Sequence, residues 1–176
     1  MLSVSLAVVL SFSPALPTDD TKSQPPKTSK TERKPNPLAP SLPETTEEEE
    51  DKFDKIIARF ILFDTGKLPG PEGKKALEDF KNLPPESIFA LIRGLNKAAA
   101  INDSCPALII ARRVASQMRT TSDKELLQFA RENVGAAVER SRHAAVLKDL
   151  KYECARRQAS LENEKTPSCG GSTVPK

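Results

Sequence analysis

The sequence predicts an all-α fold, in which antiparallel helix pairs surround an aliphatic core and a disordered region precedes them. Aromatic residues make up 5% of the 176 residues and tryptophan is absent, so the core must consist mainly of aliphatic side chains with Phe as filler. A sheet sandwich would use more β-branched and aromatic residues. Between residues 44 and 165, apolar residues recur at helical spacing and Gly or Pro interrupts them, which indicates successive amphipathic helices.

Composition divides the chain into four parts. Residues 1–17 contain an apolar run followed by small residues, which favours a signal peptide, although they lack the usual early basic residue. Residues 18–43 are rich in Pro, Ser, Thr and Lys and predict an extended, disordered linker. The helical domain spans 44–165, and residues 166–176 form a polar, flexible tail.

A signal peptide implies a protein that is secreted or held in the periplasm or cell envelope. If the signal does not function, the protein is expected in the cytoplasm. The apolar run is too short to span a bilayer as a stable anchor, so no transmembrane anchor is expected after signal removal.

The first helix has clear start and stop signals. Thr46 and Glu49 have the spacing of a capping box, and the acidic residues around them complement the positive end of the helix dipole. Apolar residues then recur with helical period until Gly66, which is expected to end the helix.

A proline turn separates the next two helices. The second helix opens at Gly70 and Pro71, since proline is favoured in a first turn, and Pro84 and Pro85 end it and begin the third. A turn this short predicts that the second and third helices lie adjacent and antiparallel.

Three further helices follow. The fourth has a broad apolar face over residues 106–118, which predicts contacts on more than one side. Ser122 and Glu125 match a second capping box at the start of the fifth helix. The last helix is expected to run from about residue 136 to near residue 161.

The second to fifth helices fall into two pairs with similar apolar spacing. The residues that carry the pattern are Ala76, Leu77, Phe80, Leu83, Pro84, Pro85, Ile88, Leu91, Ile92 and Leu95, followed less regularly by 108–118 and 126–134. This pattern, over roughly residues 70–135, resembles a degenerate HEAT-like helical repeat. The resemblance implies an α-solenoid fragment that acts as a protein-binding scaffold with no chemistry of its own. A compact helical bundle uses the same residues and is the alternative.

No group of residues predicts catalysis. His143 is the single histidine, and its neighbours on the same helix face are apolar, which favours a structural role. Cys105, Cys154 and Cys169 lack the close pairing of zinc ligands. We therefore expect no catalytic residue, no cofactor, no metal and no enzyme activity.

The three cysteines leave the disulfide pattern open. In an oxidising compartment one intramolecular disulfide at most can form, with one thiol left over. Cys169 on the tail is geometrically the easier partner for either Cys105 or Cys154, and buried free thiols are the alternative for these two residues.

The expected function is a non-enzymatic protein–protein interaction or scaffold module with an unknown protein partner. The alternative is binding of anionic surfaces or polymers through a basic helix face. Nucleic acid is not expected, because the net charge is only +3, acidic residues interleave with the basic ones and stacking aromatics are lacking. The candidate partner-binding residues are Arg112, Arg113, Arg140, Lys148 and Lys151.

Overall fold

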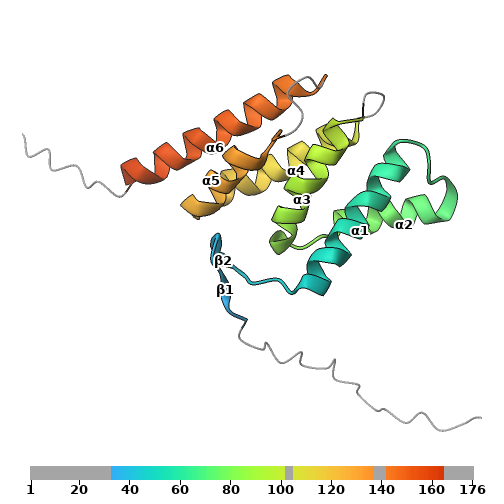
Figure 1. The fold of residues 1–176 in the computed structure, drawn as a ribbon, viewed down its shortest axis with the longest axis horizontal. Helices are drawn as coiled ribbons and strands as arrows, with labels where there is room; N and C mark the ends of the chain where they lie inside the picture. The colour runs from blue at the N-terminus through green and yellow to red at the C-terminus, as the bar shows by residue number, and fades with distance from the viewer. Residues whose placement is uncertain (1–32, 102–104, 137–141, 165–176) are drawn as a thin grey trace, which may run out of the picture. The chain divides into compact units, whose positions relative to one another are not determined.

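The computed structural model describes residues 33–101, 105–136 and 142–164 and confirms the all-α fold (Figure 1). The predicted signal peptide and the predicted tail lie outside the described residues. The elements are β1 (Pro35–Asn36), β2 (Ala39–Pro43), α1 (Glu47–Asp64), α2 (Gly70–Lys81), the 3-10 turn η1 (Pro85–Ser87), α3 (Ile88–Ala99), α4 (Pro106–Thr120), α5 (Lys124–Asn133) and α6 (Ala144–Glu164).

The predicted start and stop of α1 are both confirmed. The Thr46 side chain accepts a hydrogen bond from the Glu49 N–H at 3.3 Å, and the Glu49 carboxylate accepts one from the Thr46 N–H at 3.1 Å. Gly66 follows the helix with a φ of 73°, a conformation that favours glycine. These local signals therefore set the limits of the helix.

The helix pairing differs from the sequence prediction. α2 packs mainly against α1, where Phe60 and Phe80 stack with ring centroids 3.9 Å apart, and α3 packs against α1 and α4. The prediction that α2 and α3 form the adjacent pair is wrong. Pro84 is extended, and the 3-10 turn that follows separates the two helices.

Close approach of α1 and α3 depends on Gly94. A Cβ atom at this position would lie 2.4 Å from Cγ2 of Ile57. Because Gly94 has no side chain, the backbones of α1 and α3 can come close together. The apolar pattern of α3 does not by itself specify α1 as its neighbour.

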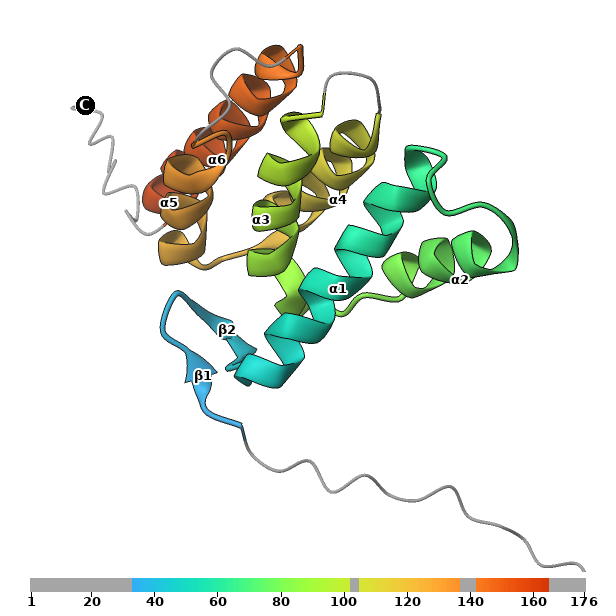
Figure 2. The ribbon, with the colours of Figure 1, turned by 45° about the vertical axis from the view of Figure 1, so that its right-hand side comes forward.

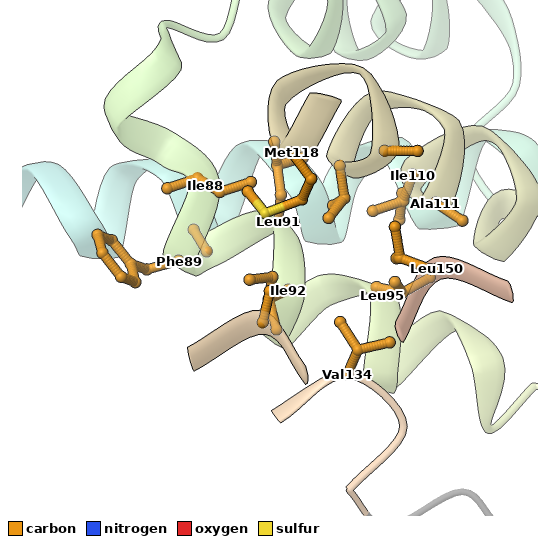
Figure 3. Close-up of a cluster of buried hydrophobic side chains, with 14 of the residues drawn as sticks. Ile88, Phe89, Leu91, Ile92, Leu95, Ile110, Ala111, Met118, Val134 and Leu150 are labelled. Carbon is orange, nitrogen blue, oxygen red and sulfur yellow. The ribbon is translucent and has the colours of Figure 1, made fainter. Parts of the chain in front are cut away.

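α3 forms the centre of the core, and nine of its twelve residues are buried. Figure 3 shows its side chains surrounded by residues of α4 and α6 and by Val134, which follows α5. The labelled core residues are Ile88, Phe89, Leu91, Ile92, Leu95, Ile110, Ala111, Met118, Val134 and Leu150.

The broad apolar face of α4 contacts two neighbours, as predicted, because α4 packs against both α3 and α6. α5 and α6 run antiparallel, and Figure 2 shows the pair beside α3 and α4. Asn96 of α3 connects this pair to the core: its Nδ2 donates to the Asn133 carbonyl oxygen at 2.8 Å, and its Oδ1 accepts from the Gly135 N–H at 2.7 Å.

Part of the predicted linker is folded. Within 18–43, the described residues 33–43 form an antiparallel hairpin, so the prediction of an extended linker is wrong for this segment. The Asn36 side chain accepts from the Leu38 N–H at 2.9 Å inside the turn, and Ala39 is fully buried in the core. Tertiary contacts thus order a segment whose composition suggested disorder.

The start of α5 also differs from the prediction. Asp123, not Ser122, occupies the N-cap position, and the expected capping box with Glu125 is not formed. The Asp123 carboxylate instead accepts hydrogen bonds from the backbone N–H and the hydroxyl of Ser41 in β2. A long-range contact has taken the place of a local one.

Candidate functional site

Two grooves lie along α6, one on each side. The first lies between α4 and α6 and has a volume of about 320 Å³. The apolar residues that line it occupy positions three or four apart on each helix. They are Leu108, Ala111 and Ala115 of α4 and Val146 and Leu150 of α6.

Charges of opposite sign border this α4/α6 groove. Arg112 and Arg119 come from α4, whereas Asp149 and Glu153 come from α6. Arg119 and Glu153 form an ion pair at 3.0 Å between the two helices. Arg112 and Asp149 are exposed and form no ion pair within the described part of the chain.

The second groove lies between α5 and α6 and has a volume of about 620 Å³. Unlike the first, it is lined almost entirely by polar and charged side chains. They are Gln128, Arg131 and Glu132 of α5 and Lys148, Lys151, Tyr152 and Gln158 of α6, with Ala155 as the single small apolar residue.

The α5/α6 groove carries an excess of positive charge. Arg131 donates a hydrogen bond to the Gln158 side chain at 2.9 Å, and Glu132 accepts one from Gln128 at 2.9 Å. Within the described ranges, Lys148 and Lys151 form neither an ion pair nor a side-chain hydrogen bond. These two ammonium groups are therefore available to an external anion.

Four of the five predicted partner-binding residues are described, and the structure does not bring these four together. Arg112 borders the α4/α6 groove, whereas Lys148 and Lys151 line the α5/α6 groove. Arg140 lies outside the described residues. The candidates that are described thus belong to two grooves and, for Arg113, to a half-buried position against the end of α2.

Arg113 is occupied by contacts within the domain. Its guanidinium donates to the carbonyl oxygens of Phe80, at 2.7 Å, and of Lys81 and Leu83, all at or beyond the C-terminal end of α2. It also lies 5.3 Å from the centroid of the Phe80 ring. Burial lowers the pKa of Arg113 from its ordinary value. A cation at the C-terminus of a helix complements the helix dipole. Arg113 therefore stabilises the packing of α4 against the end of α2.

Sequence reasoning missed Tyr152 and Arg131. Tyr152 is the single tyrosine of the chain, and 69% of its surface is exposed. Lys148 and Tyr152 are four residues apart on α6, a spacing that places both on one helix face and could have pointed to the groove. The spacing of residues in the sequence could not show that Arg131 lines this groove, because its position beside the α6 residues depends on the packing of α5 against α6.

The single histidine and Cys154 are both buried. His143 is 5% exposed and precedes α6, which begins at residue 144 and not near 136 as predicted. Its structural role stays a prediction. Cys105 and Cys154 both carry free thiols. Burial, with a smaller effect of Glu153, raises the pKa of the Cys154 thiol to about 11, which makes it unreactive near neutral pH.

Among the described residues, no group of three or more His, Cys, Asp or Glu side chains is arranged to hold a metal ion. None of the helices in the same residues has the length and apolar character needed to cross a membrane.

Comparison of the chain with known protein families, with curated protein sequences and with solved structures finds no match.

Proposed function

We propose that this protein is a non-enzymatic interaction module whose α4/α6 groove binds an amphipathic helix of a protein partner. The observation that carries the proposal is the apolar lining of this groove, in which half-buried Leu108 and Val146 lie beside the buried side chains of Ala111, Ala115 and Leu150. In keeping with the resemblance to HEAT-like repeats, we propose that the domain serves as a scaffold. The N-terminal sequence supports the further proposal that the protein is exported.

The shape of the groove favours a helix as the occupant. Leu108, Ala111 and Ala115 follow one another along α4, and Val146 and Leu150 run beside them on α6. Two parallel apolar rows of this kind accept residues spaced i, i+3 and i+7 on a third helix. The small side chains of the two alanines allow its backbone to approach closely.

The charges of the rim specify the partner further. Arg112 offers a positive charge on the α4 side, and Asp149 offers a negative charge on the α6 side. The partner helix should therefore carry an acidic residue on one flank of its apolar face and a basic residue on the other. This arrangement would also fix the direction in which the helix binds.

The proposal can be tested by selecting binders from a displayed library of 16-residue peptides and measuring their affinities. We expect the selected peptides to share apolar residues at i, i+3 or i+4, and i+7. Their affinity should fall at least tenfold for Leu108→Lys. The matched control is Ile109→Lys, because Ile109 is the next residue of α4, is 39% exposed and lies outside the groove.

Equal loss of affinity in the two variants would contradict the proposal, as would selected peptides without a helical apolar period. Circular dichroism and a thermal melt of each variant separate loss of binding from loss of fold. Export is tested separately by the intact mass of the protein from separated cell fractions: loss of about the first 15 residues outside the cytoplasm supports it, and a full-length cytoplasmic protein contradicts it.

A further inference from the structure

We infer that the α5/α6 groove is a second binding site, specific for an acidic segment of a protein in extended conformation. The site is distinct from the α4/α6 groove and uses different residues of α6. The inference therefore goes beyond the proposed helix-binding function and can fail or succeed independently of it.

The positive charge of the groove is the first observation that supports an acidic ligand. Arg131, Lys148 and Lys151 line it, and Glu132 is the single acidic residue among the lining side chains. The two lysines have no anionic partner among the described residues, so binding a carboxylate would not require an existing ion pair to break. Glu132 is already hydrogen-bonded to Gln128, which reduces its competition for these cations.

The remaining lining residues suit a peptide. Gln128 and Gln158 offer amide groups that can both donate to and accept from a peptide backbone. Tyr152 projects an exposed ring with a hydroxyl, which can pack on a side chain or donate to a carbonyl oxygen. Three cations, two amides and one aromatic ring match an extended chain with intermittent carboxylates.

The length of the groove sets the length of the segment. Its α6 residues extend from Lys148 to Gln158, which corresponds to roughly 15 Å along the helix at about 1.5 Å per residue. An extended peptide rises about 3.3 Å per residue, so about five residues fit. Two or three carboxylates within five residues would match the three cations.

Densely charged polymers fit this groove less well. Asp149 and Glu153 lie on the neighbouring face of α6 and border the other groove, so the positive potential does not extend around the helix. A nucleic acid or a sulfated polysaccharide presents regularly spaced charges and is favoured by a longer positive surface. The short, mixed lining of the α5/α6 groove favours an acidic peptide.

The test uses a fluorescein-labelled nine-residue peptide with Glu at alternate positions and Ser or Gly between them, in fluorescence anisotropy at 50 mM salt. We expect saturable binding to the full-length protein, weakened at least tenfold by the double substitution Lys148→Glu and Lys151→Glu. The matched control is Lys52→Glu with Lys55→Glu, which makes the same charge change at two exposed lysines of α1 with the same three-residue spacing. The control should change the affinity by less than twofold.

A second variant tests the part of the site that does not depend on charge. Tyr152→Ala leaves the net charge unchanged, and the exposure of Tyr152 makes the substitution safe for the fold. It should weaken peptide binding about threefold, an effect that general attraction to a basic protein would not produce.

Three results would overturn the inference. The first is no measurable binding of the peptide, and the second is equal weakening by the α1 and α6 lysine pairs. The third is tighter binding of a heparin oligosaccharide or an oligonucleotide of equal charge that is also lost on Lys148→Glu with Lys151→Glu, since it would assign the groove to a charged polymer. Peptide binding that survives Leu108→Lys shows that the result does not depend on the α4/α6 groove.

Discussion

The carboxylate of Asp123 accepts hydrogen bonds from both the backbone N–H and the hydroxyl of Ser41, a residue 82 positions earlier in the chain. Asp123 is the N-cap residue of α5 and is 8% exposed, whereas Ser41 belongs to β2 of the N-terminal hairpin. The contact holds the hairpin against the end of the helical domain where α5 begins. It also places a negative charge at the N-terminus of a helix, where the helix dipole stabilises it.

Asp123→Ala should therefore lower the free energy of unfolding by about 1–2 kcal/mol, because it leaves the Ser41 donors without their charged acceptor. Ser41→Ala should cost less, since its backbone N–H is retained. Urea denaturation followed by circular dichroism gives both values. In the double variant the effects should be less than additive; strict additivity would show that the hydroxyl and the carboxylate do not interact in solution.

Gly94→Ala should destabilise the protein by about 1–3 kcal/mol despite the better helix propensity of alanine. The reason is the approach of α1, which would bring the new methyl group to 2.4 Å from Cγ2 of Ile57. Leucine has no such branch at Cβ, so Ile57→Leu should recover part of the loss in the Gly94→Ala background. The midpoint of thermal unfolding measures both effects. Stabilisation by Gly94→Ala alone would contradict the close packing of α1 and α3.

Arg113→Met should lower the free energy of unfolding by about 2 kcal/mol, because it removes charge-assisted hydrogen bonds to the end of α2 and the contact with the Phe80 ring. Arg113→Lys should retain part of this stability, since lysine keeps the charge but not the planar set of donors. The neighbouring exposed Arg112→Met is the control and should stay within about 0.5 kcal/mol of the wild type. Similar values for the two methionine variants would argue against the structural role of Arg113.

The two free thiols of the described residues should differ in reactivity. Cys105 is exposed, whereas Cys154 is fully buried and has a pKa of about 11. At pH 8 only about 0.1% of Cys154 would be thiolate, the reactive form. Iodoacetamide should therefore label Cys105 in the folded protein, and both residues only in urea, as read by peptide mass spectrometry. Rapid labelling of Cys154 under native conditions would show that α6 opens easily.

The capping box of α1 should contribute to the pH dependence of stability. The hydrogen bond from the Thr46 backbone, together with the Arg33 guanidinium, lowers the pKa of Glu49 below its ordinary value. A lowered folded-state pKa means that this contribution is present above the unfolded-state pKa and is lost as the pH falls through the folded-state value. Glu49→Gln should reduce the loss of stability between about pH 5 and pH 3. An unchanged acid profile would show that the carboxylate contributes nothing.

The amino-acid sequence alone is sufficient to predict the features that depend on neighbours within one or two helical turns. Thr46, Glu49 and Gly66 bound α1 where predicted, and the apolar period identified six helices and an aliphatic core. It also predicted that α4 would be covered on two sides. Such features can be predicted from the sequence because capping and helical periodicity relate residues three or four positions apart.

The pairing of the helices and the exposure of individual charged groups depend on contacts between distant parts of the folded chain. Arg112 and Arg113 are adjacent in the sequence, yet one borders a groove and the other is bound to the end of α2, 30–33 residues earlier. Both grooves along α6 likewise combine residues from two helices, and the helix-helix contacts that form them depend on side-chain packing between distant segments. The spacing of apolar residues predicts which face of a helix is buried, but not which other helix packs against that face. The helix pairing and the grooves can therefore be recognised only in the folded chain.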